Sequence, residues 1–333
     1  MQIKTDIHNK EAHHKYLRIC RKIHIFMEKK GYTQVDVPVL SPSLIPESYL
    51  EVFETEFYFS NKKEKLYLTP SPELFLKRLI AKGIGNCYAM TKSFRNSEPF
   101  SSRHASEFTL LEFYKVKADY MDIAKDTLEM MRSIAQTLYG KNEITYQNKK
   151  VSFAKWEKIT VTEAFDQYAG ISNVLDEERF LHDAKQKGYV VDGFSYVDLW
   201  SQIYTQDVEP YLGVNGFPTI IYEYPPQLAA TAQLDTKKGV VERLEFYIEG
   251  IELGNCGNAS TKTTNRKDEE KRMDTEIELR KKMGKISYKA DKEFVDVLLH
   301  MPACAGIAIG LERLGMVFTN VNTIRDLKLV YIE

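Results

Sequence analysis

The sequence is poor in cysteine and in long apolar runs. Its four cysteines lie far apart: Cys20, Cys87, Cys256 and Cys304. Without Cys-x-x-Cys spacing, they indicate neither a zinc site nor a disulfide framework. No apolar stretch is long enough to span a bilayer, and the N-terminus lacks the apolar core of a signal peptide. We therefore expect a soluble, cytoplasmic, globular protein.

An excess of either charge is also absent. The 333 residues include 46 Lys and Arg and 47 Asp and Glu, for a formal net charge of -1. Because proteins that bind nucleic acid through phosphate neutralisation are normally basic, that class is disfavoured. The hydrophobic share of 43% suffices for a sizeable core and excludes a disordered protein. The length is compatible with two domains, or with one large domain that carries an insertion.

Hydrophobic periodicity predicts the main elements. Helical spacing covers residues 11–30, 71–82, 120–139 and 177–187, and another helix begins at Leu311. Strand patterns cover residues 32–37, 87–90, 107–116, 218–224 and 306–310, with a hairpin over 241–253 that turns at Glu249-Gly250. Residues 151–210 show no clear sheet contribution, so we interpret them as a mostly helical insertion. Antiparallel strands with helices around them indicate an α+β fold.

The strand at residues 107–116 has a face suited to a nucleotide. Alternation places four side chains on that face: Phe108, Leu110, Glu112 and Tyr114. Arg95 and Arg103 flank its end, and arginine forks suit phosphate oxygens while a phenylalanine can stack on a purine. An ordinary sheet with a polar rim is the alternative, and periodicity alone favours it.

The hairpin brings two carboxylates together. With a two-residue turn, Tyr247 faces Glu252, and Glu245 is the diagonal neighbour on the same face. Two inward carboxylates repel unless a cation lies between them, and proteins often hold Mg²⁺ with such a pair and substrate phosphates. The alternative is that one carboxylate points to solvent, and the pattern does not decide between them.

Residues 306–310 form a strand with one bare face. Gly306, Ala308 and Gly310 alternate with branched residues, which lets a ligand approach the backbone. Arg313, in the following helix, is placed to reach a phosphate or a base. Taken alone, such a run more often reflects tight packing.

In order, these segments resemble the three signature motifs of class II aminoacyl-tRNA synthetases, in the subgroup for lysine, aspartate and asparagine. Residues 31–40 are similar to motif 1, whose proline (Pro38) lies at the family's dimer interface, and residues 94–114 and 306–313 resemble motifs 2 and 3. Residues 71–79 and Met301-Pro302 look lysyl-like rather than aspartyl-like. The resemblance spans nearly the whole chain. It implies the class II antiparallel β-sheet flanked by helices, amino-acid activation with ATP and Mg²⁺, and a homodimer.

The resemblance implies a role for each matching position. Arg95 would hold the α-phosphate and the amino-acid carboxylate as the adenylate forms, so Arg95 and Arg313 are the expected catalytic residues. Arg103 and His104 would bind the outer phosphates, and Phe108 and Arg313 would enclose the adenine. The chemistry needs positioning and charge neutralisation more than acid–base catalysis.

Metal and substrate residues follow from the same resemblance. Glu245 and Glu252 would bind Mg²⁺. Five positions match the amino-acid pocket: Glu73, Glu112, Tyr114, Asn255 and Ala308. The first three correspond to residues that surround the substrate's amino groups in lysyl enzymes.

Within the family, the sequence looks closest to the bacterial paralogue that joins lysine or β-lysine to a lysine of elongation factor P. Lysyl-tRNA synthetases carry an anticodon-binding barrel before motif 1, whereas only a short stretch precedes it here. We therefore expect residues 1–333 to form a single catalytic domain without an anticodon-binding domain. Residues 224–233, residues 245–253 and Ala308, where lysyl synthetases have glycine, also resemble the paralogue. The implied acceptor is elongation factor P or a similar protein, with tRNA less favoured.

One position departs from the lysyl pattern. Ala259 stands where lysyl enzymes have the glutamate that pairs with the substrate's ε-ammonium. A buried ammonium without its carboxylate costs several kcal/mol unless another group compensates. The simpler hypothesis is a substrate other than lysine, such as a neutral or β-amino acid, although Glu73 is a candidate substitute.

Other functions remain as alternatives. One is a synthetase that charges tRNA or a small-molecule amine, and another is a non-catalytic sensor of an amino acid or nucleotide. Sensors tend to lose the motif arginines or the metal carboxylates, which are all present here. The charged segment 266–285 is either a tRNA-binding arm or a solvated helix face, and its mixed signs favour the second.

Overall fold

The computed structural model describes residues 1–96, 101–229, 232–259 and 265–332, and the chain divides into two compact units. Unit 1 comprises residues 1–118 and 260–333, and unit 2 comprises residues 119–259. Each unit combines a largely antiparallel sheet with helices, so the predicted α+β fold is confirmed. No helix among the described residues is long and apolar enough to cross a membrane.

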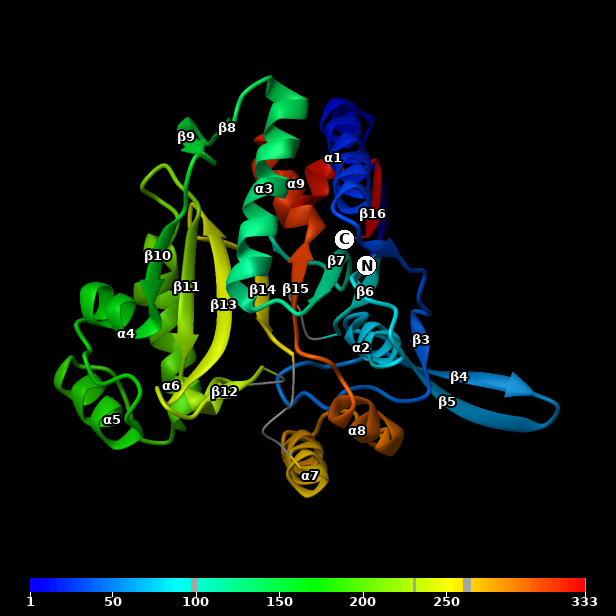
Figure 1. Cartoon of the computed structure of the whole chain (residues 1–333), viewed down its shortest axis with the longest axis vertical. Coiled ribbons are helices and arrows are strands. Elements are labelled where there is room, and N and C mark those ends of the chain that lie inside the picture. Colours follow the sequence, from blue (N-terminus) through cyan, green and yellow to red (C-terminus); the bar gives the residue numbers. More distant parts are fainter. Residues whose placement is uncertain (97–100, 230–231, 260–264, 333) are drawn as a thin grey trace. The chain divides into compact units, whose positions relative to one another are not determined.

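The sheet of unit 1 runs in the order β15-β7-β6-β2. Strand β7 (Glu107–Val116) is antiparallel to β6 (Cys87–Phe94) and to β15 (Cys304–Gly310), whereas β2 (Thr33–Gln34) runs parallel to β6. The helices of this unit are α1 (Lys10–Lys29), α2 (Glu73–Ala81), α7 (Arg266–Lys282), α8 (Lys292–Leu299) and α9 (Leu311–Thr319). Strand β1 (Ile3–Thr5) pairs with β16 (Val330–Ile332), so the first and last described segments lie side by side (Figure 1).

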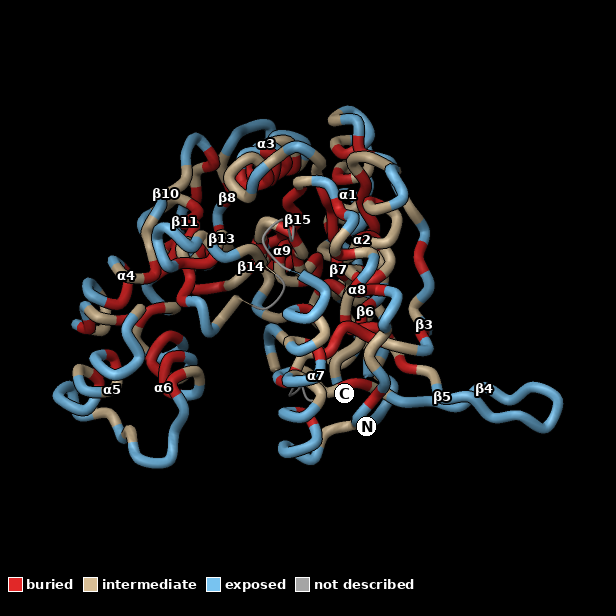
Figure 2. The backbone as a smooth tube through the Cα atoms, turned by 60° about the horizontal axis from the view of Figure 1, so that its bottom comes forward, coloured by how far each residue is buried: buried red, intermediate tan, exposed pale blue. Residues whose placement is uncertain are grey.

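A second sheet of unit 1 projects from its surface. Strand β5 (Lys62–Leu68) pairs with β3 (Leu40–Ser41) at its base and with β4 (Glu54–Phe59) along its length. The β4–β5 hairpin extends away from the other elements, and Figure 2 shows that its outer part is exposed. The sequence patterns did not predict this hairpin, because Lys62, Lys63, Glu64 and Lys65 put charged side chains on both faces of β5 and leave no apolar alternation there.

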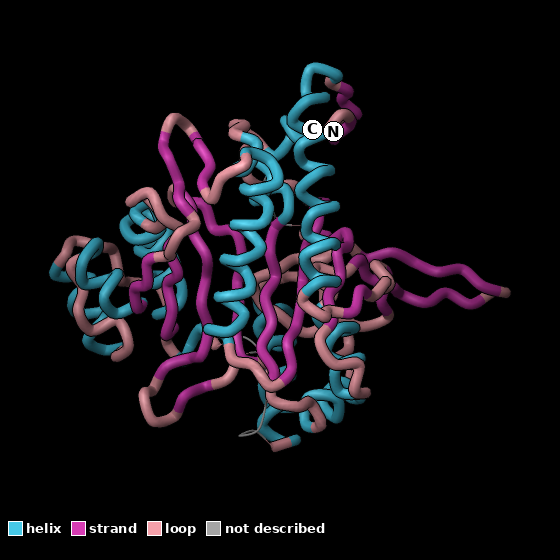
Figure 3. Tube along the Cα trace, turned by 45° about the horizontal axis from the view of Figure 1, so that its top comes forward, coloured by secondary structure: helices cyan, strands magenta, loops and turns pink. Residues whose placement is uncertain are grey.

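Within unit 2 the strands are hydrogen-bonded in the order β10-β11-β13-β14, and β12 (Leu234–Asp235) is paired to β13. Its strands are β10 (Glu157–Thr160), β11 (Thr219–Tyr224), β13 (Val240–Ile248) and β14 (Ile251–Asn258). Helix α3 (Tyr120–Tyr139) lies along β13 and β14 (Figure 3). The remaining elements are α4 (Val161–Ala164), α5 (Glu177–Gln186), α6 (Tyr196–Ile203) and a small sheet of β8 (Glu143–Tyr146) and β9 (Lys149–Ser152).

Short 3₁₀ and π segments connect these elements. The 3₁₀ segments are η1 (Ile7–Asn9), η4 (Glu209–Tyr211), η5 (Pro226–Leu228) and η6 (Ile324–Leu327), and the π segments are η2 (Phe165–Ala169) and η3 (Tyr204–Val208). The two π segments extend α4 and α6 and pack in the core of unit 2 with Phe180 and Trp200.

Local sequence explains the best-predicted elements. Helix α3 begins with a capping box in which Asp119 and Asp122 each accept a backbone N–H of the other, and it ends at Gly140 with φ +69°. The hairpin turn has φ +49° at Glu249 and +65° at Gly250, as a two-residue turn between twisted strands requires. A side chain at Gly250 would also come within 3.3 Å of the Pro210 Cα.

Several boundaries differ from the predictions. The strand expected over 32–37 is reduced to β2, whose two residues pair with β6, and β6 continues through Phe94 because it pairs with β7 along its whole length. Helix α2 begins at Glu73 rather than at residue 71, and the Ser71 Oγ accepts the Glu73 N–H at 3.3 Å. The expectation that residues 151–210 add nothing to a sheet is wrong, because β10 pairs with β11 over four residues.

Candidate active site

A buried carboxylate and a phenol mark the centre of β7. The Tyr114 hydroxyl donates to Glu112 Oε1 at 2.9 Å, which confirms that the two side chains share a strand face. Glu112 is only 2% exposed, and its second oxygen, Oε2, has no hydrogen-bond partner among the described residues. The pKa of Glu112 is raised to about 8, mainly by burial and next by repulsion from Glu73. A buried carboxylate with a free oxygen is a strong site for a cation or a donor.

Strand β15 places small residues beside Glu112 and Tyr114. Ala308 is paired with Glu112, and Gly306 with Tyr114. A Cβ atom at Gly306 would lie 2.3 Å from the Tyr114 ring, so the glycine is what lets the ring lie across β15. The bare strand face predicted from the sequence therefore lies beside Glu112 and Tyr114.

We predict that Gly306→Ala lowers stability by about 1–3 kcal/mol, because the new methyl group overlaps the buried Tyr114 ring. Thermal unfolding of the purified chain measures the effect. The matched control is Gly310→Ala in the same strand, where the nearest atom to a new Cβ is 3.9 Å away on Arg313. Equal melting temperatures for the two variants would contradict the close approach.

Helix α2 supplies the second carboxylate and an unexpected cation. Glu73 Oε1 is 2.5 Å from the Nζ of Lys77, whose side chain is only 1% exposed. The sequence analysis assigned Glu73 to the substrate's amino groups but did not consider Lys77. The four-residue spacing on one helix was the available signal. Lys77 therefore neutralises the negative charge of Glu73.

The arginines expected to bind phosphate lie at the other end of β7. The Arg95 guanidinium lies over the Phe108 ring, 5.2 Å from its centroid. Arg313 Nη2 is 2.8 Å from His104 Nε2, and Arg313 Nε donates to the Arg103 carbonyl at 3.2 Å. The Arg95 guanidinium therefore covers one face of the Phe108 ring.

His104 has a defined tautomer in this arrangement. Arg313 can only donate, so His104 Nε2 must accept, and Nδ1 then carries the hydrogen directed at Ser101 Oγ, 2.9 Å away. The positive charge available for phosphate at this point comes from Arg313 and Arg103.

Glu312 is a positioning residue that sequence reasoning missed. It is 3% exposed and accepts from the Thr109 backbone N–H at 2.8 Å and from the Thr109 hydroxyl at 2.9 Å. It lies between Leu311 and Arg313, so these bonds tie the first turn of α9 to β7 beside Phe108. An acidic residue directly before the motif arginine was the sequence signal.

The two hairpin carboxylates lie in unit 2 and have additional partners. Tyr247 pairs with Glu252 as predicted, but the register shifts after it, so Phe246 pairs with Gly254 and Glu245 with Asn255. Arg243, which the sequence analysis did not consider, bonds Glu245 Oε1 at 2.5 Å and Asn255 Oδ1 at 3.0 Å.

Tyrosines surround the other oxygen of Glu245. Its Oε2 accepts from Tyr247 at 2.8 Å and from Tyr204 at 3.2 Å. Burial raises the pKa of Glu245, while Arg243 opposes that effect and Glu252 adds to it.

The donor set of the hairpin is compatible with Mg²⁺. Two carboxylates and the Asn255 amide oxygen are all hard oxygen ligands. Glu245 Oε2 accepts from two tyrosines, and Oε1 accepts from Arg243. The positive charge of Arg243, which is bonded to Glu245, offsets the repulsion between carboxylates that the sequence analysis expected.

Cys256 lies next to this site, and its surroundings make the thiol unreactive. It is 1% exposed, its Sγ points at the Tyr120 carbonyl at 3.7 Å, and burial raises the pKa of the thiol well above its usual value. We predict that Cys256→Ser retains at least about a tenth of wild-type activity in amino-acid-dependent ATP–pyrophosphate exchange, because the serine hydroxyl can donate to the same carbonyl. An inactive variant with an unchanged melting temperature would show instead that the thiol takes part in the reaction.

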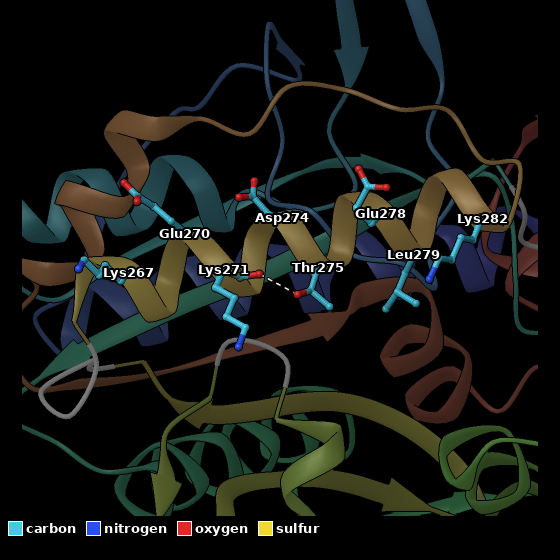
Figure 4. Close-up of a pocket in the computed structure, with 8 residues that line it drawn as sticks. All are labelled: Lys267, Glu270, Lys271, Asp274, Thr275, Glu278, Leu279 and Lys282. Carbon is cyan, nitrogen blue, oxygen red and sulfur yellow. Dashed lines mark hydrogen bonds between the residues drawn. The ribbon is translucent and has the colours of Figure 1, made fainter.

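The charged helix α7 has two different faces. One face exposes a balanced row of charged residues along a shallow pocket (Figure 4): Lys267, Glu270, Lys271, Asp274, Glu278 and Lys282. Three lysines against three carboxylates give no net attraction for a nucleic acid. The other face is not solvated as expected, because Glu269 is 4% exposed and Arg280 is fully buried.

The predicted site residues thus form two groups. Unit 1 holds nine of them: Glu73, Arg95, Arg103, His104, Phe108, Glu112, Tyr114, Ala308 and Arg313. Unit 2 holds Glu245, Glu252 and Asn255. Ala259, at the departure from the lysyl pattern, is buried at 6% exposure in unit 2 and offers no carboxylate.

Comparison with known proteins decides the family. The family model described as "tRNA synthetases class II (D, K and N)" matches residues 6–330. The chain belongs to this family. It is 30% identical over 315 residues to the lysine–tRNA ligase of Carboxydothermus hydrogenoformans, an alignment that covers 93% of this chain and 62% of that protein. It is 31% identical over 319 residues to the lysine–tRNA ligase of Escherichia coli strain K12, covering 93% and 61%.

The chain therefore spans about three-fifths of the length of these curated relatives. Membership of the class II family confirms the fold resemblance drawn from motifs 1 to 3. The family match does not distinguish the elongation factor P ligases from the tRNA ligases within this group.

Proposed function

We propose that this chain activates an amino acid with ATP and transfers it to an amine. The observation that carries the proposal is the arrangement along β7, where Arg95 and Phe108 lie at one end of a strand face and Glu112 and Tyr114 at the other. A nucleotide and an ammonium group can therefore be bound along one strand.

The reaction has two steps. In the first, a carboxylate oxygen of the amino acid attacks the α-phosphorus of ATP, the bond to the bridging oxygen breaks, and pyrophosphate leaves. Arg95 would neutralise charge at the α-phosphate, and Arg103 and Arg313 would bind the outer phosphates. In the second step, the acceptor amine attacks the carbonyl carbon of the adenylate and an amide forms. The bond between that carbon and the phosphate oxygen breaks, and AMP leaves with its electron pair.

Mg²⁺ fits the same proposal. Glu245 and Glu252 would hold it, and the ion would supply positive charge to the phosphate oxygens. Arg243 would orient Glu245 through its hydrogen bond to Oε1, and Asn255 would hold Arg243 by accepting its Nε–H. Homodimerisation through residues 31–40 remains part of the proposal.

The proposed acceptor is a lysine of elongation factor P or of a similar protein. Support comes from Ala308, from the resemblance of residues 224–233 and 245–253 to that paralogue, and from the net charge of -1. Within residues 224–233, residues 230 and 231 lie outside the described residues. We further propose that both units act as one cytoplasmic catalytic domain, with residues 151–210 as an insertion.

Charging of tRNA is the second candidate, because the similar proteins named above are lysine–tRNA ligases. ATP–pyrophosphate exchange over a panel of lysine, both β-lysine enantiomers and neutral amino acids tests the activation step. Exchange with none of them, while ATP still binds, would leave a non-catalytic sensor. Incubation with elongation factor P and intact-mass measurement then tests the acceptor, and an unmodified factor beside charged tRNA would overturn our preference.

A further inference from the structure

Tyr204 brings a hydroxyl from the segment 151–210 to a carboxylate of the hairpin. Tyr204 is the first residue of η3, directly after α6, whereas Glu245 lies in β13. The Tyr204 hydroxyl is 3.2 Å from Glu245 Oε2 and 3.0 Å from the Tyr247 hydroxyl. All three residues belong to unit 2, so these contacts lie within one compact unit. A segment that carries no motif residue therefore reaches one of the two residues proposed to bind Mg²⁺.

The ring of Tyr204 is packed as a core residue, and the hydroxyl adds nothing to that packing. Tyr204 is 6% exposed, and its ring stacks on Trp200 with the ring centroids 4.6 Å apart. The core around it is largely apolar and includes Val161, Ala164, Phe165, Leu199 and Ile203. A phenylalanine ring would fill the same space, and a buried hydroxyl is costly unless it is hydrogen-bonded. The contacts that offset this cost are those with Glu245 and the neighbouring tyrosines.

The three tyrosine hydroxyls form a chain of donors that ends at Glu245. Each phenol has one hydrogen to donate. The Tyr247 hydroxyl donates to Glu245 Oε2 at 2.8 Å, and the Tyr224 hydroxyl lies 3.3 Å from that of Tyr204. When each hydroxyl donates once, the chain runs from Tyr224 to Tyr204 and then to Oε2, either directly or through the Tyr247 oxygen. In both cases the Tyr204 hydrogen helps to hold the same carboxylate oxygen.

A separate donor holds the other oxygen of Glu245. Arg243 Nη2 donates to Oε1 at 2.5 Å, and the Arg243 guanidinium lies over the Tyr224 ring, 4.4 Å from its centroid. The terminal torsion of a glutamate is broad when nothing restricts it, whereas donors on both oxygens favour one orientation. Hydrogen bonds of this kind orient the carboxylates that ligate metal ions, and their loss typically weakens metal binding.

We propose that Tyr204 is a positioning residue that holds Glu245 in the orientation that binds Mg²⁺. The inference rests on the proposed function, and it gives the segment 151–210 a part in the metal requirement of the reaction. Tyr204 acts through Glu245, because its hydroxyl donates to the carboxylate and the carboxylate binds the ion. Loss of the hydroxyl should therefore change the affinity for the metal ion rather than the rate at saturating metal.

Binding of Mn²⁺, which prefers the same oxygen ligands as Mg²⁺, tests the inference on the full chain without turnover. Electron paramagnetic resonance of the free ion gives the dissociation constant. Tyr204→Phe keeps the stacked ring and removes the hydroxyl, and it should weaken Mn²⁺ binding by about 10–100-fold. Glu245→Gln removes the proposed ligand charge and should weaken binding at least as much.

Tyr196→Phe is the matched control. Tyr196 lies in α6, is 3% exposed, and donates its hydroxyl to the Val174 carbonyl at 2.5 Å. Its change to phenylalanine also deletes one buried hydrogen bond in unit 2, but that bond does not involve Glu245. Tyr196→Phe should therefore lower the melting temperature as Tyr204→Phe does, and leave the Mn²⁺ dissociation constant within about threefold of wild type.

The Mg²⁺ dependence of ATP–pyrophosphate exchange gives a second readout. The Mg²⁺ concentration for half-maximal exchange should rise at least about tenfold in Tyr204→Phe, and saturating Mg²⁺ should restore the rate to within about threefold of wild type. A purely structural loss would instead lower the rate at every Mg²⁺ concentration.

Failure of the inference and failure of the proposed function are separable. Absence of Mn²⁺ binding in wild type, an unchanged dissociation constant in Tyr204→Phe, or an equal loss in Tyr196→Phe would each overturn the role of Tyr204. If Mn²⁺ binds in a Tyr204-dependent way but no amino acid supports exchange, the proposed function fails and the role of Tyr204 stands. If exchange occurs with the same Mg²⁺ dependence in Tyr204→Phe, the inference fails and the proposed function stands.

Discussion

Arg95→Ala is expected to abolish amino-acid-dependent ATP–pyrophosphate exchange, a loss of at least about 10³-fold. The α-phosphate gains negative charge as the amino-acid carboxylate approaches, and a preorganised guanidinium stabilises that charge. Arg95 is preorganised in two ways: its backbone N–H donates to the Ser106 carbonyl at 2.9 Å, and its guanidinium lies over Phe108. Exchange of labelled pyrophosphate into ATP measures the loss.

Two further variants serve as controls for this prediction. Arg179→Ala removes an arginine whose side chain is 72% exposed, and it should leave exchange within about twofold of wild type. Arg95→Lys keeps the charge but not the planar fork, so it should lie between wild type and Arg95→Ala. Activity of a folded Arg95→Ala variant within tenfold of wild type would contradict the proposed role.

Arg280→Ala is expected to have the largest effect on stability. The Arg280 side chain is 1% exposed and donates to the Ile286, Glu47 and Leu50 carbonyls and to the Glu51 carboxylate. Removing it leaves buried acceptors without a donor, which costs about 3–5 kcal/mol and lowers Tm by about 6–20 °C. Thermal unfolding followed by circular dichroism measures the change.

The neighbouring lysine provides the control. The Lys281 side chain is 52% exposed and forms an ion pair with Glu278 on the helix surface, so Lys281→Ala should cost less than about 1 kcal/mol. If Arg280→Ala melted at the same temperature as Lys281→Ala, the guanidinium would not be clamping the loop over residues 45–51. Arg280→Met, which keeps an apolar stem, separates the loss of the hydrogen bonds from the loss of packing.

Much of the fold was predictable because it depends on neighbouring residues. Strand β7 and helix α3 have the predicted bounds, since alternation and a capping box are properties of contiguous sequence. The turn at Glu249-Gly250 fixed the pairing of Tyr247 with Glu252. Beyond that pair the register was not predictable, because the shift at Leu253 depends on how β13 and β14 pack.

The sequence by itself determined the family, the α+β fold and the shared face of Phe108, Glu112 and Tyr114. These conclusions rest on ordered motifs and on side-chain periods of two or 3.6 residues, which are local. Only the tertiary structure decided which charges meet. Arg280 and Glu47 are 233 residues apart in the chain, yet they form a hydrogen bond, and no periodicity relates them. A buried charge is stabilised by whichever group the fold brings near it, so its partner follows from packing rather than from spacing.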